Sequence, residues 1–358
     1  MRRVPELDAL RGLAALGVVL YHAYPHVFFL GWSCVDLFFV LSGFLITTAI
    51  LEHVRDRGFF AAFYFRRSLR IWPIYYLTLL AVLLANAMSR QGYGTDGIIW
   101  HLFFLQNIQH YVHAATPAFP HPFSPSWSVA IEEQFYLLWP ATLWLCGRGA
   151  AIPVALGLIV LSVIARVGGW PYDILIGRGD GLAFGAVLAA LWRSVPASEP
   201  GRSQRMSALM KRFLAFGLAA SLFASVIAIT FWQNPIPQWT PIAFPVFGAL
   251  WFGIVGLVLC RTGSKLLWPL RLPVLRWLGS ISYAMYMFHL PIMTYSPALL
   301  ERCGVHSVAA QTVIEWLAIF GLPTVSYWVM EKPLLSLKRL LPYPGELPSV
   351  PKASLAQA

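Results

Sequence analysis

The sequence predicts an all-α integral membrane protein with about ten transmembrane helices. Three observations support this fold class. Hydrophobic residues make up 58% of the 358 residues and charged residues only 11%, whereas a soluble domain carries about 25% charged residues. The apolar residues gather in runs close to the ~20 residues that a membrane-spanning helix needs. The basic residues fall mostly in short segments between those runs, as they do in the cytoplasmic loops of membrane proteins.

The apolar runs define the predicted spans within a single membrane domain, residues 1–332. The spans are expected at residues 9–29, 33–51, 71–88, 127–146, 151–168, 174–193, 213–233, 240–260, 277–297 and 308–330. The polar, proline-rich segment 333–358 is predicted to be a flexible cytoplasmic tail, and we expect no additional module after it.

The run at residues 98–113 decides the orientation of the chain. It is apolar but contains Gln, Asn and three His residues, and if it spanned the membrane the basic segment 193–212 would lie outside. The positive-inside rule therefore favours a re-entrant or interfacial segment near 98–113. The basic loops at 55–70, 193–212 and 261–276 then share one side, which the positive-inside rule makes cytoplasmic. Both termini are cytoplasmic in this arrangement. The net charge of +11 is accounted for by these loops, and we expect no nucleic-acid partner.

The cysteine and histidine spacing shows no strong metal-ligand pattern. We expect the four cysteines to be free packing residues, with a Cys34–Cys303 disulfide as the alternative; the set is Cys34, Cys146, Cys260 and Cys303. His110 and His113 form an H-x2-H pair, but no clear third ligand accompanies them. We therefore expect no bound metal.

Arg11 and His22 are the leading functional candidates. They are eleven residues apart, so on a helix they return to within about 20° of the same face, about 16 Å apart along the axis. A cation near the inner membrane edge and an imidazole past mid-depth would then face the same space. Ionisable groups in hydrocarbon are costly and usually functional. We therefore interpret the protein as an enzyme organised around His22.

Acidic residues in the second and fourth predicted spans are the next candidates. Asp36 is predicted to hold the His22 imidazole in one tautomer, as carboxylates do for catalytic bases; a purely structural role is the alternative. Glu132 and Glu133 are adjacent, so they point about 100° apart and cannot both face one point in a cavity. Pairing with Arg166 or Arg178 is the structural alternative for these two.

Three further motifs contribute candidates with both structural and functional interpretations. The cluster of Arg66, Arg67 and Arg70 is typical of a membrane anchor or of a phosphate site, because guanidinium groups bind phosphates in a bidentate manner. Arg178 and Asp180 are expected at the outer mouth. Ser282, Tyr286 and His289 share a helical face, and His289 is equally typical of a buried core residue.

Seven motifs in order resemble the acyltransferase-3 family of integral-membrane O-acyltransferases. They are RGLAALGVVLYH, VDLFFVLSGFLI, RRSLRIWPIYY, WSVAIEEQFYLLWP, GRGDGLAFGAVLA, SISYAMYMFHLPI and SYWVMEKP, within residues 5–333. The resemblance implies that His22 is the catalytic histidine and that Arg66, Arg67 and Arg70 serve acyl-CoA use. It also implies an acetyl-CoA donor, a saccharide acceptor and the bacterial cytoplasmic membrane.

The resulting hypothesis is acyl transfer across the membrane. His22 acts as general base on an acceptor hydroxyl, and Asp36 and Glu132 are further catalytic candidates. Arg11 is expected to bind acyl-CoA together with Arg66, Arg67 and Arg70. An acyl-histidine intermediate is the alternative route. The acceptor side and cavity are expected to involve Ser42, Trp127, Glu133, Arg178, Asp180, Tyr286 and His289. A transporter and a non-catalytic scaffold are the competing classes; the lack of internal repeats disfavours the transporter.

Overall fold

The structure is a computed structural model that describes residues 4–89, 97–112, 121–194, 202–230 and 240–343. Helices account for all the regular structure in these ranges, and no strand occurs in them. Five helical stretches are long and apolar enough to cross a membrane by themselves: Phe29–His53, Phe59–Met88, Arg148–Val167, Pro241–Cys260 and Val308–Arg339. The described part of the chain is therefore all-helical and the protein is a multi-pass membrane protein, which confirms this much of the predicted fold class.

Ten helices of at least 15 residues occur within these described ranges. They are α1 (Pro5–Ala23), α2 (Cys34–His53), α3 (Phe59–Ser89), α6 (Ser126–Cys146), α7 (Ala151–Val167), α9 (Asp180–Ser194), α10 (Arg202–Thr230), α11 (Thr240–Cys260), α12 (Pro273–Arg302) and α13 (Val308–Ser326). Each contains most of one predicted span. That all ten cross the bilayer stays a prediction, since five stretches meet the length and hydropathy requirement.

Three segments differ from the predicted boundaries. Helix α1 ends at Ala23 rather than near residue 29, and the chain continues through a turn into the 3-10 helix η1 (Phe29–Ser33). The run 98–113 forms two short helices, α4 (Ile98–Leu102) and α5 (Gln106–Val112), while residue 113 lies outside the described residues. At about 1.5 Å per residue, neither helix is long enough to cross a bilayer. The predicted span 174–193 is divided between α8 (Leu175–Arg178) and α9.

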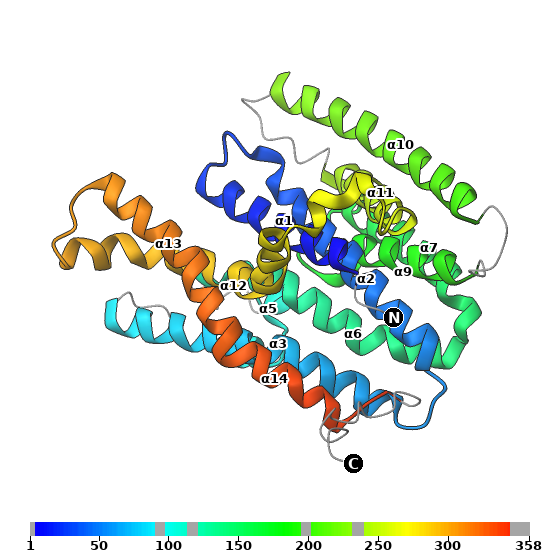
Figure 1. The fold of residues 1–358 in the computed structure, drawn as a ribbon, viewed down its shortest axis with the longest axis horizontal. Coiled ribbons are helices and arrows are strands. Elements are labelled where there is room, and N and C mark those ends of the chain that lie inside the picture. Colours follow the sequence, from blue (N-terminus) through cyan, green and yellow to red (C-terminus); the bar gives the residue numbers. More distant parts are fainter. Residues whose placement is uncertain (1–3, 90–96, 113–120, 195–201, 231–239, 344–358) are drawn as a thin grey trace, which may run out of the picture.

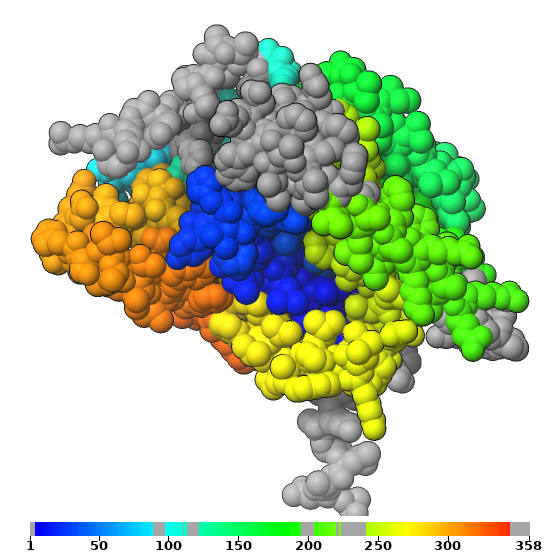
Figure 2. All heavy atoms as spheres, turned by 90° about the horizontal axis from the view of Figure 1, so that it is seen from above, coloured from blue at the N-terminus to red at the C-terminus, as the bar shows by residue number. Residues whose placement is uncertain are grey.

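Helices α1 and α2 occupy the centre of the bundle (Figure 1). The main pairings are α1 with α12, α2 with α9, and α10 with α11. Figure 2 shows α1 in dark blue between the orange C-terminal helices and the green and yellow helices α10 and α11. The first helix is thus held between two groups of helices, and its polar residues can face the interior of the bundle.

The crossing of α1 and α12 depends on two glycines. A Cβ atom at Gly12 would lie 2.6 Å from the backbone nitrogen of Gly279, closer than real Cβ contacts allow. Gly279 faces the backbone of Asp8 just as closely. Small residues let membrane helices approach in this way, and the close approach brings the α1 residues next to those of α12.

We expect Gly12→Ala to lower the stability of the protein by about 1–3 kcal/mol, because the new methyl group must push two backbones apart. The matched control is Gly157→Ala in α7, where an added Cβ meets nothing within 4 Å. That control should leave stability unchanged or raise it by up to about 1 kcal/mol. Thermal unfolding in detergent measures both; equal behaviour of the two variants contradicts the packing argument.

The first part of the predicted tail is packed against the bundle. After α13 come the π-helix Tyr327–Glu331, α14 (Lys332–Ser336) and a 3-10 turn, Leu337–Leu340. Tyr343 is buried and stacks on His53, with ring centroids 4.8 Å apart. Residues 344–358 of the tail lie outside the described residues. Cys34 and Cys303 are both free, so the alternative of a disulfide between them is wrong.

Candidate active site

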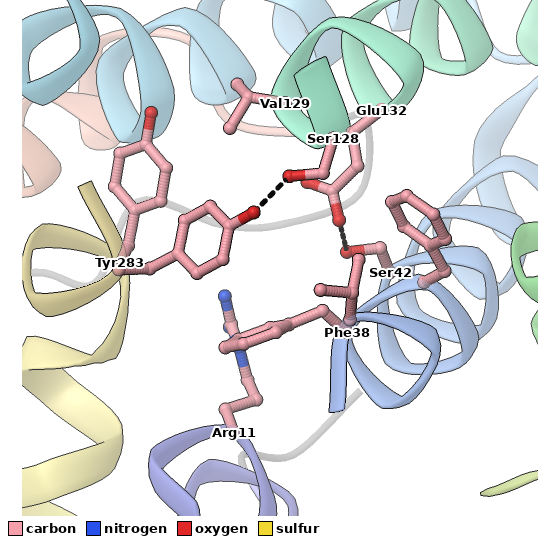
Figure 3. A pocket seen from close by; sticks show the side chains of 10 residues that line it. Arg11, Phe38, Ser42, Ser128, Val129, Glu132 and Tyr283 are labelled. Atoms are coloured by element: carbon pink, nitrogen blue, oxygen red, sulfur yellow. Dashed lines mark hydrogen bonds between the residues drawn. The ribbon is translucent and has the colours of Figure 1, made fainter. Parts of the chain in front are cut away.

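A small cavity lies where α1, α2, α6 and α12 meet (Figure 3). Its volume is about 40 Å³, which is room for a few water molecules. It is lined by Arg11, Val35, Phe38, Phe39, Ser42, Ser128, Val129, Glu132, Tyr283 and Tyr286. The polar groups among these converge from four different helices, as they do in a ligand site.

Helix periodicity explains which side chains reach the cavity. On α2, Val35, Phe38, Phe39 and Ser42 follow the i, i+3, i+4, i+7 spacing of a single helix face. On α6, Ser128 and Glu132 are one turn apart and share a face. Figure 3 shows Glu132 and Ser42 pointing toward each other across the cavity wall, and Ser42 Oγ donates a hydrogen bond of 2.7 Å to Glu132 Oε1.

The two adjacent glutamates have different surroundings. Glu132 lines the cavity and accepts a second hydrogen bond, 3.0 Å long, from the Tyr136 hydroxyl. Glu133 points away toward α3, where Trp72 Nε1 donates to its Oε2 at 3.3 Å. The structure thus answers the question that the sequence left open: Glu132 faces the cavity and Glu133 does not line it.

Arg11 extends from α1 into the cavity (Figure 3). It interacts electrostatically with Arg67 and Arg70 of α3, and with Asp8 and then Glu132 as counter-charges. Within the described residues, none of the three arginines forms a hydrogen bond, and Arg67 Nε is buried without a partner. We name these three residues, Arg11, Arg67 and Arg70, the arginine cluster. Its unused donors match the requirements of an anionic ligand.

Arg66 differs from the other arginines of its motif. Its Nε donates to the backbone oxygen of Leu341 at 3.2 Å, and its guanidinium lies 4.1 Å from the centre of the Tyr343 ring. The packed tail therefore binds Arg66. The predicted set of Arg66, Arg67 and Arg70 is therefore divided: residue 66 binds the tail, whereas residues 67 and 70 interact electrostatically with Arg11 of the cavity.

Tyr286 connects the cavity with a pair of histidines. Its hydroxyl lies 2.6 Å from Ser128 Oγ and donates to the Pro125 carbonyl at 3.0 Å. Its ring packs edge-on against Phe38, with centroids 5.9 Å apart, and lies 5.8 Å from the ring of His289. Tyr286 therefore contacts both the cavity and the next group of polar residues along α12.

His22 lies in the last turn of α1, next to His289. His22 Nδ1 is 3.0 Å from the Val18 carbonyl and 3.2 Å from His289 Nε2. The ring centroids are 5.0 Å apart. His289 is fully buried, whereas His22 is exposed. His22 is not among the cavity-lining residues, so Arg11 and His22 do not face one common space as predicted. Tyr286 lies between them, because it lines the cavity and also packs against His289.

Asp36 pairs with an arginine instead of His22. Its Oδ2 lies 3.1 Å from Arg178 Nη2, and both side chains are almost completely buried. A second buried pair joins Arg166 Nη2 and Asp180 Oδ2 at 2.7 Å. Arg178 and Asp180, both expected at the outer mouth, are thus buried and belong to two different ion pairs. The α8–α9 junction separates these two residues, and positions two apart on a helix point in nearly opposite directions.

Aromatic rings surround Arg178. The Phe244 ring lies 3.4 Å from its guanidinium carbon, and Trp127 and Trp32 each lie 5.9 Å away. Contacts with ring faces stabilise a buried cation. Trp127, expected on the acceptor side, also packs edge-on against Phe39, which lines the cavity. The two ion pairs and these rings form the wall next to the cavity.

Sequence reasoning missed several residues of the site. Ser128, Tyr283 and Phe38 line the cavity, Tyr136 binds Glu132, and Glu331 interacts electrostatically with two members of the arginine cluster, Arg11 and Arg70. The one-turn spacing of Ser128, Glu132 and Tyr136 was a usable signal, since polar groups on one face of an apolar helix mark a buried polar contact. Glu331 carried no such signal, because it lies in a π-helical turn that the residue spacing does not predict.

The fold defines a helical membrane protein, and comparison with known sequences supplies its family. The chain matches the acyltransferase domain family over residues 4–331 and belongs to that family. It is 30% identical to the putative peptidoglycan O-acetyltransferase YrhL of Bacillus subtilis, over 93% of this chain and 55% of the relative. It is 27% identical to the peptidoglycan O-acetyltransferase OatA of Listeria monocytogenes, over 92% and 56%.

A putative O-acetyltransferase of Staphylococcus aureus, SACOL0978, is also 27% identical, over 82% of this chain and 51% of that protein. The chain spans about half the length of these curated relatives. No solved structure matches it. The resemblance seen in the seven motifs is thereby confirmed.

Proposed function

We propose that the protein transfers an acetyl group from cytoplasmic acetyl-CoA to a hydroxyl group of an extracytoplasmic or membrane-linked saccharide. The observation that carries this proposal is the arrangement along α1. Arg11 joins the arginine cluster in the first half of the helix, and His22 occupies its last turn. A single helix thus connects an anion-binding region with an imidazole about 16 Å away along its axis.

The arginine cluster is suited to the phosphates of coenzyme A. Clustered guanidinium groups bind phosphate oxygens through charge-assisted hydrogen bonds. Arg67 and Arg70 lie in the first half of α3, near the loop that joins it to α2. The positive-inside rule favours a cytoplasmic location for this basic loop and for both termini. We accordingly propose that the donor enters from the cytoplasm, in the bacterial inner membrane.

In the proposed reaction, His22 Nε2 removes the proton from the acceptor hydroxyl, whose oxygen attacks the thioester carbonyl carbon. The tetrahedral intermediate collapses and breaks the carbon–sulfur bond. The imidazolium then returns the proton to the thiolate of coenzyme A. The hydroxyl groups of Tyr286 and Ser42 are the candidate donors for the oxyanion, and each must turn its single proton away from its present acceptor, Pro125 or Glu132, to do so. We assign Glu132 to orienting Ser42 and balancing Arg11, and Asp36 to holding Arg178.

The names of the relatives support a cell-wall saccharide as the acceptor. YrhL and OatA are named for peptidoglycan O-acetylation. The exposed position of His22 at the end of α1 is compatible with an acceptor that is too large to enter the cavity. The competing transporter interpretation requires no coenzyme A site. Binding of coenzyme A therefore distinguishes an acyltransferase from a transporter.

We expect coenzyme A to raise the unfolding temperature of the purified protein, because a ligand of the native state stabilises it. Arg70→Gln should weaken this binding about tenfold or more, since a charge-assisted hydrogen bond contributes about 1.5–3 kcal/mol. The control is Arg302→Gln, an exposed residue at the end of α12. If coenzyme A binds neither wild type nor control, the cytoplasmic donor is excluded and the transporter becomes the leading interpretation.

A further inference from the structure

His22 and His289 form a hydrogen-bonded pair of imidazoles contributed by two different helices. His22 belongs to α1 and His289 to α12, the two helices that also approach each other closely at Gly12 and Gly279. The distance from His289 Nε2 to His22 Nδ1 is 3.2 Å. On its other side, His289 Nδ1 lies 2.5 Å from the Tyr286 carbonyl oxygen.

The carbonyl groups determine which ring nitrogens carry protons. A carbonyl oxygen only accepts hydrogen bonds, so the ring nitrogen that faces it must be the N–H donor in a neutral imidazole. His289 therefore carries its proton on Nδ1, toward Tyr286, and its Nε2 presents a lone pair. His22 Nδ1 faces both the Val18 carbonyl and that lone pair, so it also carries the proton.

The opposite assignment is unfavourable at two places. If His289 Nε2 carried the proton, Nδ1 would be unprotonated. The lone pair of Nδ1 would then face a lone pair of the Tyr286 oxygen 2.5 Å away. His22 Nδ1 would likewise present a lone pair to the Val18 oxygen at 3.0 Å. An unmade hydrogen bond of this kind in a buried place costs about 1–3 kcal/mol. The pair therefore has one preferred proton arrangement.

We propose that His289 is a positioning residue that, together with the Val18 carbonyl, fixes the tautomer and the ring orientation of His22. Its Nε2 accepts the His22 Nδ1 proton, which leaves the lone pair of His22 on Nε2, the atom that acts as base. This inference rests on the proposed function, in which His22 removes a proton from the acceptor. His289 contacts no substrate in this account and acts only through His22.

The environment of the pair suits this role. His289 is completely buried, and the Tyr286 carbonyl holds its ring from the opposite edge. His22 lies at the carboxyl end of α1, where the partial negative charge of the last carbonyl groups stabilises the positive charge that forms on the imidazolium during the reaction. The proton on Nδ1 stays hydrogen-bonded to Val18 and His289 throughout the reaction.

Two substitutions of His289 separate this role from simple packing. Leucine fills similar space but accepts no hydrogen bond, whereas the side-chain carbonyl of glutamine can accept one near the former Nε2 position. We expect His289→Leu to lower kcat about 100-fold, since a misplaced catalytic group costs about that much, with KM for acetyl-CoA unchanged. His289→Gln should retain kcat within about tenfold of wild type. His306→Leu, at an exposed position, is the control.

The outcomes distinguish failure of this inference from failure of the proposed function. If wild type turns over and His22→Ala is inactive, but His289→Leu keeps its kcat or equals His289→Gln, the positioning role is excluded while the acyltransferase remains. If wild type itself shows no acetyl-CoA chemistry, the proposed function fails first. Nitrogen-15 NMR of the histidine rings in wild-type protein gives a test that needs no folded variant. A His22 ring protonated on Nδ1 supports the inference, and one protonated on Nε2 overturns it.

Discussion

His22→Ala is expected to lower the rate of acetyl transfer by about 100- to 10,000-fold, the usual contribution of a general base. The measurement follows free coenzyme A and radiolabel released from acetyl-CoA by purified protein, with and without cell-surface glycan. Binding of coenzyme A should persist, because the arginine cluster lies about 16 Å away along α1. His306→Ala is the matched control, since it removes an exposed histidine outside the site. Wild-type transfer rates in a folded His22→Ala protein contradict the mechanism.

The same assay separates the two chemical routes. Direct attack requires the acceptor, so coenzyme A is released only when glycan is present. An acyl-histidine intermediate forms without the acceptor, so wild-type protein retains the label and His22→Ala does not. Our proposal of a general base predicts the first pattern. Retained label on wild-type protein assigns His22 as the nucleophile, and the Nε2 lone pair then forms the bond to the acyl carbon.

Arg178→Met is expected to lower the stability of the protein by about 3–5 kcal/mol, because it leaves the Asp36 carboxylate buried without its counter-charge. Asp36 is 0% exposed and Arg178 is 2% exposed, so water cannot replace the lost partner. Thermal or denaturant unfolding in detergent measures the change. The exposed control Arg302→Met should shift stability by less than about 0.5 kcal/mol.

A double variant tests whether the cost comes from the unpaired charge. Combining Arg178→Met with Asp36→Leu removes both charges, and replacing a whole buried ion pair with apolar residues is often nearly neutral. We expect the double variant to recover at least half of the lost stability. If it is no more stable than Arg178→Met alone, the contacts of the guanidinium with Phe244 and its neighbouring rings are the main contribution.

The sequence predicted the helices better than their contacts. Runs of apolar residues reveal spans because the bilayer sets their length, and the ten long helices follow the predicted runs closely. Boundaries were less accurate where the chain turns, as at Ala23, because a turn at the membrane edge can stay apolar. The positive-inside rule favoured a re-entrant or interfacial segment near 98–113, and the two helices there are too short to span; their place in the membrane stays a prediction.

Partners between helices were the least predictable feature. Residue spacing tells which face of a helix a side chain occupies, but not which other helix packs on that face. Asp36 was assigned to His22 for this reason, whereas the packing of α2 on α9 brings it to Arg178. Likewise, the sequence showed that only one of Glu132 and Glu133 can face the cavity, and the packing of α6 against α2 decides that it is Glu132.

The small size of the cavity has an electrical consequence. In the proposed topology, the enzyme receives one reactant from each side of a membrane that holds an ion gradient. Moving one elementary charge through 100 mV corresponds to about 2.3 kcal/mol, so a continuous water column between the two sites would dissipate energy with every ion. A cavity of about 40 Å³, with Phe38 packed against Tyr286 in its wall, is too small for such a column. In the proposed mechanism the donor displaces this contact to reach His22, and the contact would then limit ion leakage between turnovers.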